Sequence, residues 1–201
     1  MSVILRARAL GLIMVIALTG AVAGCTSAAS SSDVVVSSGS ISWSVPSAWR
    51  MTATPPLWSG GLVGITFVSP DDIAGHCLIQ SGHLATLEGC WPIATLPQNG
   101  VLVASIPLHS PTPQPAASPW ATIHASGGAF PVFREVPGPC GAIGASETLV
   151  GFAPGGGDQV GDAAMPGAEE MLACVRGPDL AAGEASVTAI LASVRPRDRP
   201  S

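Results

Sequence analysis

The chain has 201 residues, in which eight arginines and no lysine stand against thirteen acidic residues, so its formal net charge is −5. Because a nucleic-acid-binding protein needs a basic face to meet phosphate, this balance excludes that class. The apolar share of 47% is too high for general disorder, while 24 glycines and 19 prolines predict many turns and loops.

The first residues have the layout of a secretory signal peptide. Arg6 and Arg8 precede an apolar stretch at 9–18, and small residues follow at 19–24. The uncharged run from residue 9 to residue 24 is 16 residues long. That is shorter than the roughly 20 residues that a helix needs to cross the hydrocarbon core. We therefore expect export and cleavage, and a permanent membrane span is the lesser alternative.

The end of this segment, Val22-Ala23-Gly24-Cys25, resembles the bacterial lipobox, in which an aliphatic residue and two small residues precede a cysteine. Its one departure is Val22, where that family more often has leucine. The resemblance implies that cleavage makes Cys25 the new N-terminus and that its thiol carries a diacylglyceryl group. Such a group would hold the protein on the outer face of the cell membrane, because two acyl chains anchor firmly where one binds marginally.

The alternative is a conventional cleavage site, at which Cys25 is merely a small residue. The lack of lysine, the single asparagine and the abundance of Ala, Gly, Pro and Val are typical of high-GC bacterial genomes. The chain thus resembles a lipoprotein of an uncharacterised envelope family of high-GC Gram-positive bacteria.

Removal of residues 1–24 leaves 177 residues with six basic and thirteen acidic side chains, a net charge of −7. The Ser-rich and Ala-rich residues 25–40 are predicted to be a tether. Residues 41–195 are predicted to form a single globular domain and residues 196–201 a disordered tail. Within the tether range, Val34–Val36 could add an edge strand.

Four cysteines remain besides Cys25. An even number outside the membrane predicts two disulfides, for which three pairings exist. We favour Cys77 with Cys90 and Cys140 with Cys174, because the segments between these partners are short and carry turn residues. Each bridge is expected to stabilise the fold by about 2–4 kcal/mol.

Apolar residues that alternate with small polar ones between turn signals predict strands along the whole domain. The turn signal Asn99-Gly100 introduces the clearest strand, at 100–106. Residues 107–119 contain five prolines and are predicted to form an exposed extended loop, since proline supplies no ladder donor. Further strands are expected at 40–46, 62–68, 76–79, 120–124, 129–133, 142–152 and 170–175.

The strands at 142–152 and 170–175 flank a glycine-rich loop and are expected to pair as an antiparallel hairpin, which would bring Cys140 and Cys174 to the same end. After them, apolar residues recur at helical spacing and predict a helix over Asp179–Val194, which Pro196 ends. The predicted fold is therefore α+β, an antiparallel sheet with a C-terminal helix packed on one face and two disulfides. The apolar positions of this helix are Leu180, Val187, Ile190, Leu191 and Val194.

Two short motifs frame the domain. A strand closes in Val45-Pro46-Ser47-Ala48-Trp49, and a helix closes in Ile190-Leu191-Ala192-Ser193-Val194-Arg195. Their order resembles small exported domains of the Mog1/PsbP-like type. The resemblance concerns the fold and transfers no site residue.

Two nitrogen and two sulfur ligands lie within fifteen residues, a set that would suit zinc. Outside the cell the cysteines are expected to be oxidised, so a disulfide is favoured over a metal. These residues are His76, Cys77, His83 and Cys90.

No catalytic motif stands out in the sequence. The G-x-S-x-G sign of a serine hydrolase is absent, and His124 with Ser126 is better interpreted as a turn. We predict no catalytic residue, no metal and no cofactor. The enzymatic alternative is a cell-envelope hydrolase with dispersed residues, whose candidate bases are His76, His83, His109 and His124.

Two acidic pairs, Asp71-Asp72 and Glu169-Glu170, are candidate catalytic carboxylates. Adjacent side chains of an extended chain point apart, so we expect each pair in water at a turn or strand start. The segment Gly155–Asp162 resembles phosphate and calcium loops in composition only, and a flexible connection is predicted.

Three of the five tryptophans, Trp43, Trp49 and Trp58, are close in sequence. Tryptophan faces can stack on sugars, but core packing is the expected role. The leading hypothesis is a membrane-anchored, non-enzymatic domain that binds an envelope protein, glycan or lipid. A purely structural surface protein is a further alternative.

Overall fold

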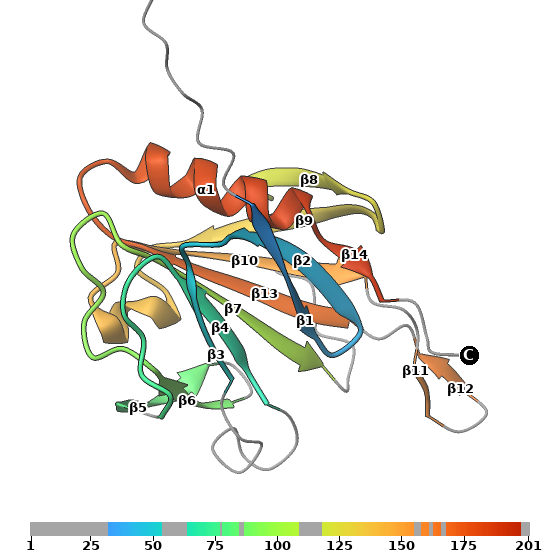
Figure 1. Cartoon of the computed structure of the whole chain (residues 1–201), viewed down its shortest axis with the longest axis horizontal. Helices are drawn as coiled ribbons and strands as arrows, with labels where there is room; N and C mark the ends of the chain where they lie inside the picture. The colour runs from blue at the N-terminus through green and yellow to red at the C-terminus, as the bar shows by residue number, and fades with distance from the viewer. Residues whose placement is uncertain are drawn as a thin grey trace, which may run out of the picture. The chain divides into compact units, whose positions relative to one another are not determined.

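An antiparallel sheet of seven strands, ordered β3-β4-β7-β13-β10-β9-β8, is the framework of the fold (Figure 1). The structure, a computed structural model, describes residues 32–53, 64–76, 78–84, 87–108, 118–154, 158–160, 163–165 and 168–197. These residues belong to one unit, Ser31–Ser201. The strands of the large sheet are β3 (Arg50–Ala53), β4 (Thr66–Ser69), β7 (Val101–Leu108), β8 (Ala121–Ala125), β9 (Gly128–Glu135), β10 (Glu147–Pro154) and β13 (Ala168–Val175).

A smaller sheet, ordered β1-β2-β14, is built on the hairpin of β1 (Asp33–Ser38) and β2 (Ile41–Pro46), with β14 (Arg195–Pro196) beside β2. Strand β1 contains Val34–Val36, for which an edge strand was one possibility from the sequence. It lies within residues 25–40, the range predicted as tether. Two short ladders are the other strand pairs seen among the described residues. They pair β5 (Ile79–Leu84) with β6 (Leu87–Trp91) and β11 (Asp158–Val160) with β12 (Ala163–Met165).

One face of the large sheet is covered by helix α1 (Leu180–Ala192) together with the β1–β2 hairpin (Figure 1). The Asp179 side chain accepts from the Ala182 backbone N–H at the start of the helix, as the capping residue at this position predicts. The predicted helix on one face of an antiparallel sheet is thus confirmed. The buried apolar positions of α1 and its C-terminal flank are Val187, Ile190, Leu191 and Val194.

The opposite face of the large sheet has its own core, to which residues 91–96 and the 3-10 helix η2 (Pro139–Ile143) contribute. Strands β10 and β13 pair in the register Thr148↔Cys174, as the predicted hairpin requires. The Cys140–Cys174 disulfide, with an S–S distance of 2.02 Å, therefore links η2 to β13. This pairing is confirmed.

The strand expected at 142–152 begins only at Glu147, so the first part of that prediction is wrong. Pro139 starts η2 instead, and Gly144 ends it in a left-handed conformation. The Thr148 hydroxyl accepts from the Cys140 backbone N–H at 3.1 Å and donates to the Pro137 carbonyl at 2.6 Å. These bonds fold the chain back before the strand can begin.

The proline-rich loop was expected to begin at Pro107, but β7 continues to Leu108. Strand β4 pairs with β7 only from Val103 to Ser105, while β13 pairs with it as far as Leu108. A proline at position 107 therefore lies beyond the β4 ladder, where a missing N–H costs no bond to β4. Residues 109–117 lie outside the described residues.

The strand predicted at 76–79 is wrong for His76 and Leu78, which lie in bends, and the other predicted strands are found with shifted ends. Strand β4 begins at Thr66, and β5 begins at Ile79, where the strand expected at 76–79 was to end. None of the helices in the described part of the chain has the length and hydropathy of a membrane span.

Candidate functional site

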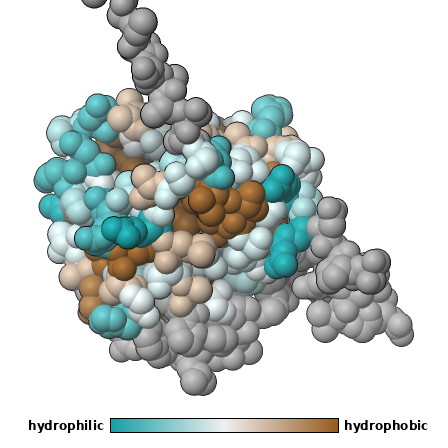
Figure 2. Space-filling model, viewed as in Figure 1, coloured by the Kyte–Doolittle hydropathy of each residue, from teal (hydrophilic) through white to brown (hydrophobic). Residues whose placement is uncertain are grey.

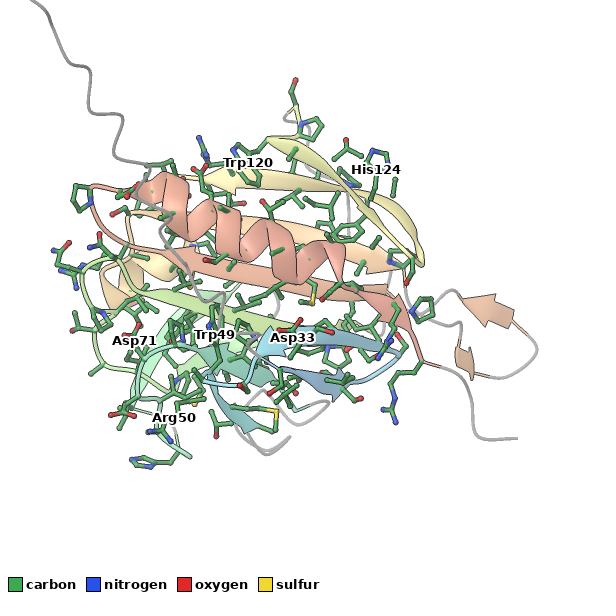
Figure 3. The ribbon with its side chains drawn as sticks, turned by 45° about the horizontal axis from the view of Figure 1, so that its top comes forward. Asp33, Trp49, Arg50, Asp71, Trp120 and His124 are labelled. Carbon is green, nitrogen blue, oxygen red and sulfur yellow. A yellow bond between two sulfur atoms is a disulfide. The ribbon has the colours of Figure 1, made fainter. Side chains whose placement is uncertain are left out.

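A pocket with a volume of about 250 Å³ opens between the β1–β2 hairpin and α1. The hairpin contributes Asp33, Ser44 and Pro46 to its wall, and Trp49 closes one side. Figure 3 shows Trp49 and Asp33 on the hairpin side of α1. The helix lines the pocket with Ser186, Ala189, Ile190 and Ser193.

The turn after β2 places Trp49 at the pocket. Pro46 ends the strand, and the Trp49 backbone N–H donates to its carbonyl at 2.9 Å. The Ser47 N–H donates to the Ser32 carbonyl at 3.2 Å, which ties this turn to the residue before β1. A half-buried tryptophan is thereby held at the corner between the small and the large sheet.

The hydroxyls of the helix wall are largely used within the protein. Ser193 Oγ accepts from the Ser44 N–H at 2.8 Å and donates to the Ile190 carbonyl at 2.6 Å. Ser186 Oγ donates to the Ala182 carbonyl at 3.1 Å. Because these groups already have partners, Pro46, Trp49 and the helix side chains present mainly apolar surface.

An exposed apolar strip borders the pocket. Val34 and Val35 on β1 are 48% and 52% exposed, and Figure 2 shows a brown area over this strand. Strand β1 is an edge of the small sheet, and among the described residues no backbone bond to its outer edge is seen. The exposed apolar strip of Val34 and Val35 and the pocket together form one candidate binding surface.

The predicted cysteine sites divide into described and undescribed positions. Cys140 and Cys174 are joined and fully buried. Cys90 is buried at the end of β6, while Cys25 and Cys77 lie outside the described residues. One disulfide is therefore seen among the described residues, and the pairing of Cys77 with Cys90 stays a prediction.

The histidines do not meet at a common site in the described part of the chain. His76 is exposed in a bend and His124 is exposed on β8 (Figure 3). The side chain of His83 and all of His109 lie outside the described residues. No three His, Cys, Asp or Glu side chains that the structure describes are grouped to hold a metal ion.

The turn predicted for His124 with Ser126 is found at Ser126, whereas His124 lies within β8. Ser126 and Gly127 are the two turn residues between β8 and β9, and Ser126 Oγ donates to the Val194 carbonyl at 3.2 Å. The hydroxyl is thus used to hold the hairpin against the end of α1.

The acidic pairs behave differently from each other. The side chain of Asp72 is 97% exposed and forms an ion pair with Arg50 at 3.5 Å, which agrees with a solvated turn. Burial, followed by the charge of Asp72, raises the pKa of Asp71. Glu169 has no exposed surface at all, so the prediction that both members of its pair lie in water is wrong. The β1–β2 turn covers the Glu169 side chain, and the local sequence around Glu169 does not predict this contact.

The tryptophans also divide. Trp43 and Trp91 are fully buried core residues, as expected, whereas Trp49 and Trp120 are half-buried and Trp58 lies outside the described residues. Of the segment Gly155–Asp162, only residues 158–160 are described, as strand β11.

A charged cluster on the α1 side of β9 and β10 was not predicted from the sequence. Arg134 Nε lies 3.0 Å from Glu147 Oε2, and its guanidinium also pairs with Glu184 and lies 5.2 Å from the Trp120 ring centre. The sequence signal for this cluster is the excess of thirteen acidic over eight basic residues. Because arginines are few, each of them has several carboxylates with which it can form an ion pair.

No protein-family model, curated protein or solved structure matches the chain.

Proposed function

We propose that this protein is a lipid-anchored, extracytoplasmic binding protein without enzymatic activity, and that it captures a partner at the pocket between the β1–β2 hairpin and α1. The observation that carries the proposal is the apolar wall of that pocket, formed by Pro46, Trp49, Ala189 and Ile190. Buried anchor positions of this kind supply most of the free energy in protein interfaces.

The size of the pocket favours a side chain over a whole small molecule. Its volume of about 250 Å³ lies below the roughly 300–1,000 Å³ typical of sites that enclose a ligand. One aliphatic or aromatic side chain of a partner protein fits such a volume. The exposed Val34 and Val35 then extend the contact beyond the pocket.

The charge of the surface favours a basic partner. Among the described residues that line the pocket, Asp33 is the only one with an ionisable side chain, and the mature chain carries a net charge of −7. A partner that presents an apolar side chain beside an arginine or lysine would match both features, because opposite charges steer association and fix orientation.

The anchor would keep the pocket near the membrane. Eight residue steps separate Cys25 from Asp33, so the fully extended chain spans at most about 28 Å between them. An envelope protein at the membrane surface is therefore the partner class that we propose, and free lipid or glycan is a test outcome. The lipobox lipid at Cys25 and a second disulfide between Cys77 and Cys90 belong to the same proposal.

The hydrolase alternative lacks a supporting observation. His76 and His124 are both exposed, and neither lines the pocket. The side chain of His83 and all of His109 lie outside the described residues.

Filling the pocket tests the proposal. In Ala189→Trp the indole would occupy the space between helix and hairpin, whereas Ala181→Trp places the same side chain at an exposed helix position outside the lining. We would titrate the lipid-free chain from residue 26 with peptides that carry Leu or Trp beside Arg, with their Glu-containing counterparts, with short-chain phosphatidylcholine and with peptidoglycan fragments. The readout is the NMR shift of the Ser44 and Ser193 amides.

We expect the basic apolar peptides to shift these amides, Ala189→Trp to abolish the shift and Ala181→Trp to retain it. Shifts caused only by lipid or only by glycan would replace the proposed partner class. No shift with any probe, or equal shifts in both variants, would remove the pocket from the proposal.

A further inference from the structure

A carboxyl group is buried directly beneath the tip of the β1–β2 hairpin. Glu169, near the start of β13, has no exposed surface. Its Oε2 accepts from the Ser40 backbone N–H at 3.2 Å and from the Ser40 hydroxyl at 3.4 Å. A Cβ added at Gly39, which has φ +47°, would lie 2.4 Å from Glu169 Oε1. The turn is therefore closed against the carboxyl with no space between them.

The second carboxyl oxygen is poorly satisfied. The Ser38 and Ser105 hydroxyls face the carboxyl and lower its pKa, yet among the described residues neither Glu169 Oε1 nor Ser105 Oγ has a partner with hydrogen-bond geometry. An ionised group in this position is costly because it has lost its water. A protonated carboxyl could donate to the Ser105 hydroxyl and so would suit the site better.

The charged side chains around the tip of the hairpin do not offset the desolvation cost of an ionised Glu169. Arg197 donates to the Gly39 carbonyl at 3.3 Å and Arg195 donates to Ser42 Oγ at 3.2 Å, but neither forms an ion pair with Glu169 in the described structure. Opposite Glu169, β7 presents Pro107 and β10 presents Ala153, which carry no charge. The neighbouring Glu170 has its own raised pKa, from burial and then from the charge of Glu135.

The direction of the proton linkage follows from this environment. Burial raises the pKa of Glu169 from its ordinary 4.5 to about 7, against the smaller lowering by the Ser40, Ser38 and Ser105 groups. Because the folded-state pKa is the higher one, the full stability is present below pH 4.5 and is lost as the pH rises through 7.

We propose that Glu169 is a proton-controlled latch that holds the tip of the β1–β2 hairpin on the large sheet when protonated and loosens it when ionised. The hairpin also carries Asp33, Ser44 and Pro46 of the pocket wall. The latch itself rests on Glu169 and the turn above it, so it stands whether or not the pocket binds a partner.

The test follows the tip of the hairpin in the mature chain. The carboxyl of Glu169 is titrated by NMR, and hydrogen exchange of the Ser40 amide is compared with that in Glu169→Gln at each pH. We expect a midpoint near pH 7 and a relative loss of Ser40 protection of up to about 300-fold between pH 4.5 and 8. Glu170→Gln, one position along the strand, is expected to keep the wild-type pH dependence at Ser40.

A midpoint near 4.5, or Ser40 exchange with the same pH dependence in Glu169→Gln, would overturn the proposal. If Glu169→Gln folds poorly, a second pair of variants tests the contact between the hairpin tip and Glu169. Gly39→Ala is expected to weaken Ser40 protection at pH 5 at least tenfold, because its Cβ displaces the carboxyl. Gly75→Ala, whose Cβ would meet nothing within 4 Å, is expected to leave protection unchanged. Equal protection in the two variants would also contradict the latch.

Discussion

At the scale of single residues, one arginine neutralises a buried acid. Glu147 is 1% exposed, and burial raises its pKa, while Arg134 lowers it and Glu184 raises it. Arg134 is itself held on three sides, by Glu147, by Glu184 and by the ring of Trp120. Arg134 is the only cation that pairs with Glu147 among the described residues. A buried carboxylate that loses such a partner keeps its desolvation cost, so this contact should matter more than a surface ion pair.

We therefore expect Arg134→Met to lower the free energy of unfolding by about 3 kcal/mol at pH 7, as measured by urea denaturation. Without the guanidinium the pKa of Glu147 rises further. The loss should then shrink as the pH falls and the carboxyl takes up a proton. Adding Glu147→Gln to Arg134→Met should recover most of the loss. Arg50→Met, which removes the exposed Arg50–Asp72 pair, should have little effect.

An equal loss in the single and double variants would mean that Arg134 contributes through packing on Trp120 and not through its charge. Sequence alone could not identify Arg134 as the partner of a buried acid, and it singled out Glu169 only as one of an acidic pair expected in water. The burial of a charged side chain depends on which element covers it, and neither the hairpin turn above Glu169 nor the Arg134 contacts follow from local spacing. Cys140 and Cys174 were predictable because both lie at one end of a single hairpin.

At the scale of elements, a glycine sets the distance between α1 and the sheet. Gly183 is buried in the first half of the helix, and a Cβ there would lie 2.4 Å from Val175 Cγ1 on β13 and 3.4 Å from Val101 Cγ2 on β7. Valine is stiff at χ1, so it cannot turn away cheaply. The helix consequently approaches the sheet more closely than an alanine would allow.

We expect Gly183→Ala to destabilise the protein by about 1 kcal/mol, because overpacking outweighs the gain of about 1 kcal/mol in helix propensity. Thermal unfolding would measure this. In the Gly183→Ala background, Val175→Ala should cost less than it does in the wild type, since it makes room for the new methyl group. A stabilised Gly183→Ala variant would show that propensity alone decides the site.

The elements were predictable where the spacing of apolar side chains repeated regularly over many residues. The helix, the strand at 100–106 and the pair at 142–152 with 170–175 had such a period, and each corresponds to an element of the structure. Element η2 was not predictable, because its bonds to Thr148 depend on a side chain beyond the turn. The extension of β7 through Pro107 depends on where β4 stops pairing.

At the scale of the whole molecule, the sequence predicted a sheet with a helix on one face, but it did not predict that the β1–β2 hairpin shares that face. The hairpin supplies Ile41, Trp43 and Val45 to the same core as α1. The pocket exists only because hairpin and helix lie side by side on the sheet. Its prediction would have required the packing of segments about 150 residues apart.

The proposed anchor would decide the compartment in which this surface acts, and intact-mass spectrometry of the protein extracted from bacterial membranes tests it most directly. We expect a mature chain that begins at Cys25 and carries a diacylglyceryl group on the thiol, with Cys25→Ser lacking this mass and leaving the membrane fraction. A mature chain that begins at another residue, with an unmodified thiol at position 25, would contradict the proposed lipid-anchored binding protein.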